Sequence, residues 1–160
     1  MSYDLLVFDP EVAPVSRPDF MAWFGDLAKW EEARDYNSPE GMTGNLPQFY
    51  DRLRPVFPPM NGPFAFDFDT LVEDKPSFWQ RLFGGRQPGP RALEPFNESM
   101  VTDYSCAASG IYMSFAWSVA EQAYDEVVRA ALETGVGFFD VSAADGVIAH
   151  TSEQLKALAI

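Results

Sequence analysis

The sequence is poor in the two residue types that most often act as reactive groups in enzymes, cysteine and histidine. It has one cysteine, Cys106, among 160 residues, which excludes an intrachain disulfide and any zinc site built from cysteines. It has one histidine, His150, and no Ser-His-Asp or Cys-His pairing can be built without that residue. We expect Cys106 to be a small buried hydrophobe on a strand and His150 to lie at the surface or in a hairpin.

Basic residues are also scarce. The chain has 11 lysines and arginines against 24 aspartates and glutamates, which gives a formal net charge of −13 at pH 7. Such a charge repels nucleic acid and anionic lipid, so a general nucleic-acid binder is excluded. The simplest interpretation is a solvated acidic surface that keeps the protein in solution.

Long apolar segments and targeting signals are lacking as well. The first residues, MSYDLLVFDPE, have no basic region and carry acids within their short apolar run, unlike a signal peptide. The uncharged run from Tyr104 to Ala120 is short for a bilayer and fits two strands and a turn better. No P-loop, GxGxxG, HExxH, GxSxG or EF-hand motif occurs. We therefore predict a cytoplasmic protein that needs no cofactor.

A strand–helix–strand unit is the clearest pattern that the sequence does contain. Residues 111–117 alternate between apolar and smaller or more polar side chains, which predicts a strand with one apolar face. Ser118 and Glu121 have the spacing of a capping box, and apolar residues at helical spacing follow as far as Gly135, a typical left-handed stop. Residues 136–141 are the second predicted strand of this unit.

The rest of the chain supplies the other elements. Residues 4–9 (DLLVFD) are apolar on both faces, as in a central strand. A helix is predicted to begin at Ser16 and to fray near Asn37, and Asn45 to cap a shorter helix that ends near residue 57. Further predicted elements are a strand at 100–106, a hairpin strand at 147–150 after Asp145–Gly146, and a weak terminal helix or frayed tail over 151–160.

This order of elements predicts an α+β fold of the ferredoxin-like, split βαβ type. In that topology two helices cover one face of an antiparallel sheet, and the first and third strands, which are the most apolar here, lie in its middle. We expect a single domain over residues 1–160, with an extra helix and an irregular insertion at about 61–99 that is rich in proline, glycine and phenylalanine.

Two acidic residues are the candidates for a metal or proton-sharing site. In the predicted sheet, Asp4 begins the first strand beside Asp140, which ends the last strand, so the two carboxylates would be neighbours. Acids at strand ends in so acidic a protein are mostly solvated turn residues. We therefore predict no metal site and keep this pair as the weak candidates for one.

The insertion reverses the local charge. Four of the 11 basic residues fall in the segment 75–91, which contains no acid, and aromatic residues lie between them. The simpler interpretation packs the aromatic side chains onto the domain, where the arginines neutralise its acidic surface. The alternative is a contact surface for another protein or for a second copy of the chain. The candidate residues of this surface are Phe78, Trp79, Arg81, Phe83 and Arg86.

Three stretches, MSYDLLVFDP, FPPMNGP and IYMSFAWSVAEQAYDEV…GVGFFDVS, resemble a group of small bacterial proteins whose activity is uncharacterised. The likeness covers both ends and the middle helix and is weakest from Phe64 to Phe96. It includes no catalytic signature, so the resemblance implies no mechanism. Some small acidic bacterial proteins of this general style neutralise toxins, and by that analogy an immunity-type role is suggested.

The leading hypothesis is a non-catalytic cytoplasmic protein that binds another protein, as an immunity-type or accessory protein, or that self-associates through the segment 75–91. The alternative is a small-molecule enzyme or ligand-binding domain with a pocket between the sheet and the insertion. That pocket would be lined by Tyr112, Trp117, Trp23 and Trp79. A third hypothesis, peripheral membrane attachment through 78–86, is disfavoured by the overall acidity.

Overall fold

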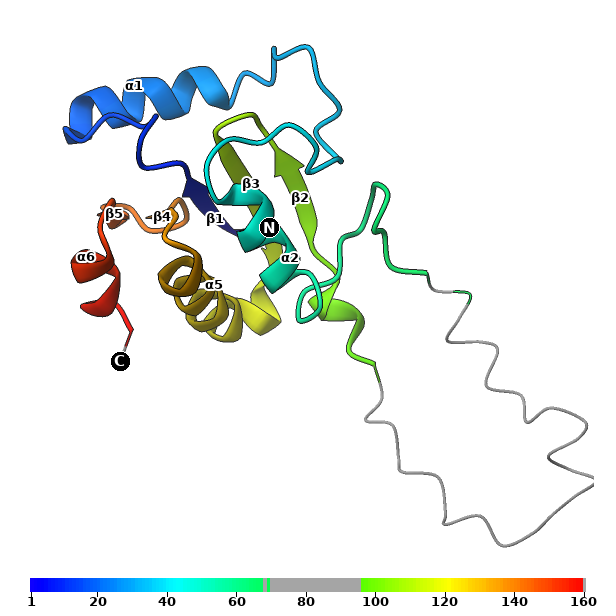
Figure 1. Cartoon of the computed structure of the whole chain (residues 1–160). Helices are drawn as coiled ribbons and strands as arrows, with labels where there is room; N and C mark the ends of the chain where they lie inside the picture. Colours follow the sequence, from blue (N-terminus) through cyan, green and yellow to red (C-terminus); the bar gives the residue numbers. More distant parts are fainter. Residues whose placement is uncertain (68, 70–95, 160) are drawn as a thin grey trace, which may run out of the picture.

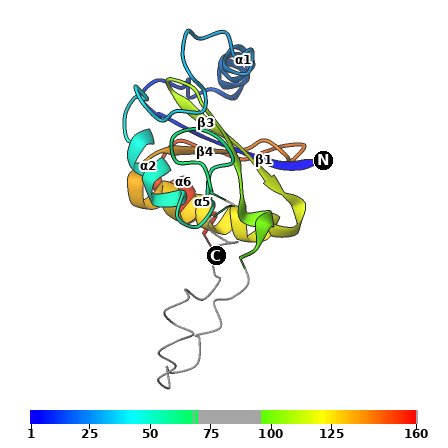
Figure 2. The same cartoon turned by 90° about the vertical axis from the view of Figure 1, so that its right-hand side faces the viewer.

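A computed structural model describes residues 1–67, 69 and 96–159 of the chain. Its strands are β1 (Ser2–Phe8), β2 (Asp103–Cys106), β3 (Gly110–Ala116), β4 (Gly137–Asp140) and β5 (Ile148–Ala149). Its α-helices are α1 (Arg17–Leu27), α2 (Leu46–Leu53), α5 (Ala120–Thr134) and α6 (Ser152–Lys156), and short 3-10 helices cover Glu98–Met100 and Trp117–Val119. The sheet lies between α1 on one side and α2 and α5 on the other (Figure 1). Figure 2 shows the same layers after a turn of 90°.

The described strands form one antiparallel sheet in the order β2-β3-β1-β4-β5. β1 pairs with β3 along its whole length and with β4 over its second half, so the first strand of the chain is the middle of the sheet. The α+β fold, the central positions of β1 and β3, and the small hairpin strand β5 agree with the predictions from the sequence.

The larger core lies between the sheet and the helices α2 and α5. Leu5 and Val7 of β1 face this side, together with Phe138 of β4. Buried alanines and valines of α5 let that helix approach the sheet closely, and Phe49 of α2 fills the space beside it. The apolar stripe predicted for α5 from its helical spacing is therefore the stripe that is buried.

The second face of the sheet is covered by α1, which corrects the prediction that this first helix shares a face with α5. Leu6 and Phe8 of β1 point to this side. They pack against Phe20 and Leu27 of α1. Because β1 is apolar on both faces, an uncovered second face would leave these side chains in water. The helix that shares a face with α5 is therefore α2, and α1 is the additional helix.

The start of α1 was predicted correctly, but its end was not. The side chain of Ser16 accepts a hydrogen bond from the N–H of Asp19, and a proline occupies the first turn. The helix ends at Leu27 and does not continue to Asn37, because Trp30 has a positive φ of 54°. In this left-handed conformation the Trp30 side chain packs into the cluster beneath α1.

The capping of α5 also differs from the prediction. A 3-10 turn precedes the helix and contains Ser118, so the N-cap is Val119, which makes no side-chain capping bond. A complete capping box occurs instead at α6, between Thr151 and Gln154, and of the two predicted alternatives, a weak terminal helix or a frayed tail, the structure has a short helix. Gly135 ends α5 in the left-handed conformation as predicted, with φ 76°.

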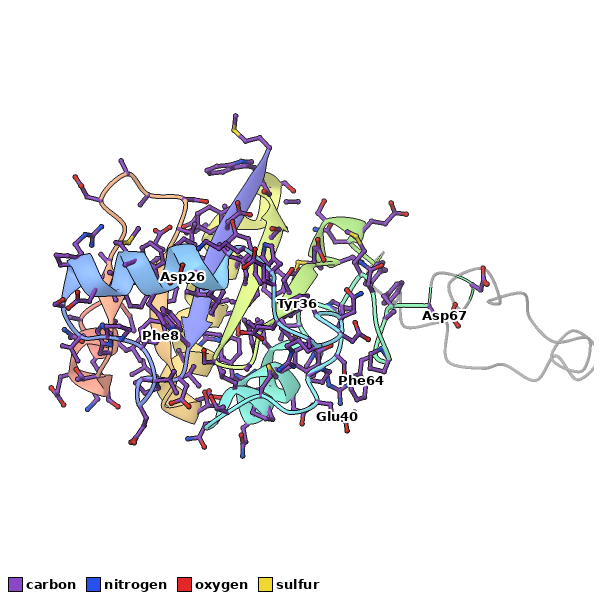
Figure 3. All side chains as sticks on the ribbon, turned by 90° about the horizontal axis from the view of Figure 1, so that it is seen from above. Phe8, Asp26, Tyr36, Glu40, Phe64 and Asp67 are labelled. Carbon is purple, nitrogen blue, oxygen red and sulfur yellow. The ribbon has the colours of Figure 1, made fainter. Side chains whose placement is uncertain are left out.

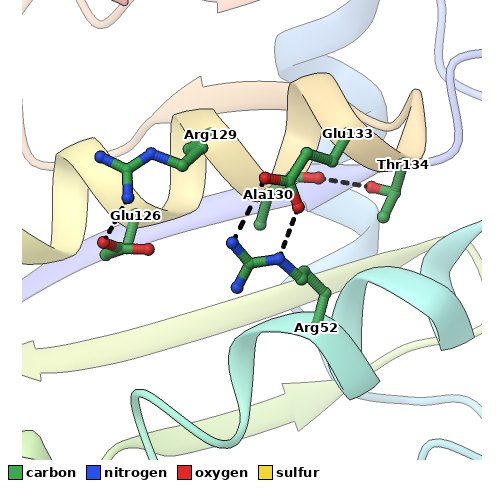
Figure 4. A network of polar contacts seen from close by, with 6 residues as sticks. All are labelled: Arg52, Glu126, Arg129, Ala130, Glu133 and Thr134. Atoms are coloured by element: carbon green, nitrogen blue, oxygen red, sulfur yellow. Dashed lines mark hydrogen bonds and ion pairs between the residues drawn. The ribbon is translucent and has the colours of Figure 1, made fainter.

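Polar side chains join α2 to α5 in addition to the core. The amide of Asn45, which was predicted to cap α2, instead donates to the carbonyl of Thr134 at the end of α5, at 2.7 Å. The guanidinium of Arg52 forms an ion pair with Glu133 of α5 (Figure 4). A second arginine drawn there, Arg129, pairs within α5 itself. The predicted local cap of α2 is therefore replaced by a contact between the two helices.

The two ends of the undescribed stretch lie side by side. The rings of Phe66 and Phe96 are stacked, with centroids 4.2 Å apart and planes 4° apart. The chain before Phe66 is attached beside the start of β2. The N–H of Met60 donates to the carbonyl of Thr102, and the N–H of Thr102 donates to the carbonyl of Pro58. The described chain on either side of the gap is thus brought together at one place between α2 and β2.

Candidate functional site

Most of the contact surface predicted from the sequence lies outside the described residues. This applies to Phe78, Trp79, Arg81, Phe83 and Arg86, and to the rest of the segment 75–91. The segment named for membrane attachment falls in the same stretch. Among the residues that the structure describes, no helix is long and apolar enough to cross a bilayer.

Tyr112 is part of the packing beneath α1. Its ring stacks on Phe24 of α1, with centroids 6.4 Å apart and 12° between the planes, and lies 5.9 Å from the ring of Trp30. Burial, and then the hydrogen bond of its hydroxyl to the Asp4 carboxylate, raise the pKa of Tyr112 to about 12. The hydroxyl is therefore protonated at neutral pH and donates to Asp4, which is a structural role.

The aromatic residues predicted to line a small-molecule pocket do not all come together in the described part of the chain. Trp23 packs into the cluster beneath α1, as Tyr112 does. Trp117 lies just past β3, is 51% exposed, and has its ring 5.3 Å from that of Tyr3. Tyr3 belongs to the core on the α5 side, so Trp117 and Tyr112 lie on opposite sides of the sheet. Trp79 is outside the described residues.

Asp4 and Asp140 lie on neighbouring strands, but their carboxylates leave the sheet on opposite faces. Asp140 is directly opposite Leu5, and successive residues of a strand alternate between faces, so Asp4 points to the α1 side. One oxygen of Asp140 accepts from the N–H of Ala143 at 3.2 Å, in the turn after β4. Nowhere in residues 1–67, 69 and 96–159 do three or more His, Cys, Asp or Glu side chains gather as a metal site.

The cysteine is fully buried and the histidine is partly buried. The imidazole of His150 lies edge-on to the rings of Phe8 and Phe20, at centroid distances of 5.0 and 5.7 Å. Neither ring nitrogen is exposed, and neither has a hydrogen-bond partner among the described residues. Burial lowers the pKa of His150 below its ordinary value of 6.5, and burial raises the pKa of Cys106 to about 12. At neutral pH the imidazole is therefore uncharged and the thiol is protonated.

The described part of the chain has an unbalanced charge. Four of the 11 basic residues and three of the 24 acidic residues fall in the undescribed stretch, which leaves seven basic and 21 acidic residues. Five of the seven basic side chains form ion pairs, namely Lys29, Arg52, Arg54, Arg129 and Lys156. The other two, Arg17 and Arg34, donate to backbone carbonyls. All seven cations are thus engaged inside the molecule, and carboxylates are left in large excess.

An open cavity of about 370 Å³ lies between the loop that follows α1, the start of α2 and the chain that leads into the insertion. Its lining includes Pro39, Glu40, Pro47, Asp51, Pro63 and Phe64, and we call it the proline groove. Glu40 and Asp51 are exposed, and Phe64 is 43% exposed. Figure 3 shows Glu40 and Phe64 beside each other, near the point where the chain runs on to Asp67. The groove therefore combines apolar walls with carboxylates.

The walls of the proline groove are held by contacts within the protein. Arg34 donates to two carbonyls of the loop, including that of Glu40 at 2.8 Å. The guanidinium of Arg54 lies 4.2 Å from the centre of the Phe64 ring and also pairs with Asp51. The walls of the groove are thus held by the protein's own side chains.

The proline groove was not found from the sequence. Its walls come from three separate stretches of the chain, near residues 39, 47 and 64, and only the tertiary fold brings them together. The one signal in the sequence is the density of prolines in the loops that flank α2, because prolines give rigid, apolar walls.

Comparison with known proteins gives no family for this chain: no family model, no curated protein and no solved structure matches it. Its function is therefore inferred from the geometry of its own residues.

Proposed function

We propose that this chain is a non-catalytic cytoplasmic protein that binds a basic partner protein, in an immunity-type or accessory role. The observation that carries the proposal is the charge balance of the described residues. Seven basic side chains, all engaged in internal contacts, stand against 21 acidic residues. Such a surface attracts a positively charged partner and raises its association rate.

The placement of the reactive side chains supports binding over catalysis. General acid–base chemistry needs groups within hydrogen-bond reach of one another or of a substrate. The imidazole of His150 packs edge-on against Phe8 and Phe20 with both ring nitrogens buried, and the thiol of Cys106 is buried. Asp4 and Asp140 point to opposite faces of the sheet. In the described part of the chain these four groups therefore do not form one site.

The segment 75–91 is a second contact region in this proposal. It is basic where the rest of the chain is acidic, and it belongs to a stretch whose described flanks, Phe66 and Phe96, stack on each other. We call the described residues 1–67, 69 and 96–159 the acidic body of the protein. The segment would be attracted by a partner protein with an acidic surface or by the acidic body of a second copy. In the capture experiment below, retention of a second copy of the chain itself would indicate self-association.

We infer further that the fold is ferredoxin-like. The four strands β4-β1-β3-β2 are adjacent in the sheet, α2 connects β1 to β2 in the chain, and α5 connects β3 to β4. Both connecting helices pack on the same face. This is the pattern of a split βαβ fold, to which α1 on the opposite face, β5 and α6 are additions.

Capture from a native lysate tests the proposed function. The intact chain is compared with a variant in which residues 75–91 are replaced by a Gly-Ser spacer of equal length. We expect a basic protein to be captured by both, because the acidic body is unchanged in the variant. A partner lost with the segment would move the contact to 75–91. No specific partner in either experiment would contradict the proposal and favour the small-molecule alternative.

A further inference from the structure

We propose that the proline groove is the surface of the acidic body that contacts the partner, and that it binds a peptide segment in which an aromatic or proline side chain is flanked by arginine or lysine. The inference rests on the proposed function and names the place where it acts. It follows from the apolar walls, the charge and the internal contacts of the groove.

The apolar walls favour a small number of apolar side chains. The volume of about 370 Å³ is near the lower end of the range for ligand pockets, about 300–1,000 Å³. Phe64 is one of the few large apolar residues with more than a third of its surface exposed in the described chain, and it borders this cavity. An aromatic or proline side chain placed between Phe64 and the proline walls removes that surface from water.

The charge of the groove favours a basic flank. Glu40 forms no ion pair among the described residues, and Asp51 shares its carboxylate with Arg54, whose guanidinium is turned to the Phe64 ring. The other nearby cation, Arg34, donates hydrogen bonds to the loop carbonyls and does not pair with Glu40. Its charge also acts on the buried Cys106, where it partly offsets the rise in the pKa of the thiol that burial causes. The carboxylate of Glu40 is therefore left to pair with a cation from outside.

The walls of the groove contact each other and other parts of the protein, which favours a low entropic cost of binding. At Gly62 the backbone approaches the neighbouring loop so closely that a Cβ would lie 2.1 Å from the carbonyl oxygen of Asn37. This contact fixes the wall that carries Pro63 and Phe64 against the wall that carries Pro39. Because both walls are already in place, little conformational freedom is lost when a segment binds.

Fluorescence anisotropy with a synthetic peptide tests the inference on the full chain. The probe is a labelled peptide with arginines on both sides of a Trp-Pro pair, and the control peptide has glutamines in place of the arginines. We expect the arginine peptide to bind about tenfold more tightly than the control, and to bind more weakly as the salt concentration rises. Equal affinity of the two peptides, or no binding of either, would overturn the inference.

Matched variants locate the binding surface. Phe64→Ala should weaken binding about tenfold, because it removes the apolar wall, and Glu40→Gln should weaken it about threefold. The controls are Met60→Ala, which truncates an apolar side chain that is 51% exposed outside the lining of the groove, and Glu121→Gln on α5, which makes the same change of charge. These two should bind as the wild type does. Thermal unfolding of each variant checks that it is folded.

The remaining outcomes separate this inference from the proposed function. If a lysate partner is captured equally well by Phe64→Ala and Glu40→Gln, the groove assignment is wrong while the proposed function stands. If the peptide binds only after residues 75–91 have been replaced by the Gly-Ser spacer, that segment of the chain competes for the groove, and the assignment to a partner protein is overturned. If peptide binding is weakened by Phe64→Ala and Glu40→Gln and unchanged by Met60→Ala and Glu121→Gln, the inference is supported.

Discussion

At the scale of single residues, His150 shows how burial without a partner sets the charge of a group. Its two ring nitrogens are unpartnered within the described structure, and its ring contacts those of Phe8 and Phe20. His150 also lines an open cavity with Arg17, whose guanidinium donates to the carbonyl of Gly146. Because its nitrogens are buried without partners, the neutral imidazole is the form that fits the folded protein.

We predict that protonation of His150 makes the protein less stable in mild acid. In the unfolded chain the pKa of His150 is near its ordinary 6.5, and burial lowers it in the folded protein. Between these two pKa values the unfolded state binds more protons, so the free energy of unfolding falls as the pH drops below about 6.5. Urea unfolding at a series of pH values, on the wild type and on His150→Phe, measures this effect. The loss should be smaller in the variant, and identical pH profiles would refute the prediction.

Two glycines give a second test at this scale. A Cβ on Gly137 would lie 2.2 Å from the ring of Phe8, and both residues are buried, so Gly137→Ala should lower the free energy of unfolding by about 1–3 kcal/mol. A Cβ on Gly25, inside α1, meets nothing within 4 Å, so Gly25→Ala should raise that energy by about 0.5–1 kcal/mol. Denaturant titration measures both, and two changes of the same sign would contradict the packing described.

At the scale of elements, α1 is the cover of the second face of the sheet, and Phe20 is its main contact. The ring of Phe20 is fully buried and touches those of Phe8, Phe139 and His150. We predict that Phe20→Ala lowers the free energy of unfolding by about 3–5 kcal/mol. The neighbouring Met21 is 39% exposed, so Met21→Ala should cost less than about 1 kcal/mol. Similar losses in the two variants would mean that α1 is not packed on the sheet.

The sequence predicts individual elements better than it predicts their partners. The alternation in β3, the helical stripe of α5 and the two apolar faces of β1 are local patterns, and each one led to the correct element. Which helix joins α5 was missed, because α1 and α2 both have an apolar side and only packing decides which face of the sheet each one covers. Trp30 ended α1 early for a tertiary reason, its place in the cluster beneath that helix.

The same limit applies to the candidate site. Tyr112 and Trp117 were grouped by residue type, but the alternation of faces along β3 and the packing of Trp117 on Tyr3 separate them. Asp4 and Asp140 were placed on neighbouring strands correctly, yet the register turns their carboxylates apart. A shift of one residue in the pairing of two strands moves a side chain to the other face of the sheet, and a single sequence does not determine this register.

At the scale of the whole molecule, the net charge of −13 affects stability as well as binding. Repulsion among unpaired carboxylates destabilises the compact state, and salt screens it. We therefore predict that the melting temperature at pH 7 rises when sodium chloride is increased from low to physiological concentration. Scanning calorimetry measures this change. A melting temperature that falls or stays constant would show that the exposed ion pairs, which salt weakens, outweigh the repulsion.

The most direct test of the acidic body as a binding surface is to determine the charge of the proteins that it retains from a lysate. The intact chain is immobilised, a native lysate is applied at low salt, and the bound proteins are released by a salt gradient and identified by mass spectrometry. A matched column carrying an unrelated acidic protein removes the general ion-exchange background. Our account predicts a specifically retained basic protein that is released as the salt rises. A retained protein that is acidic, or one that salt does not release, would contradict it.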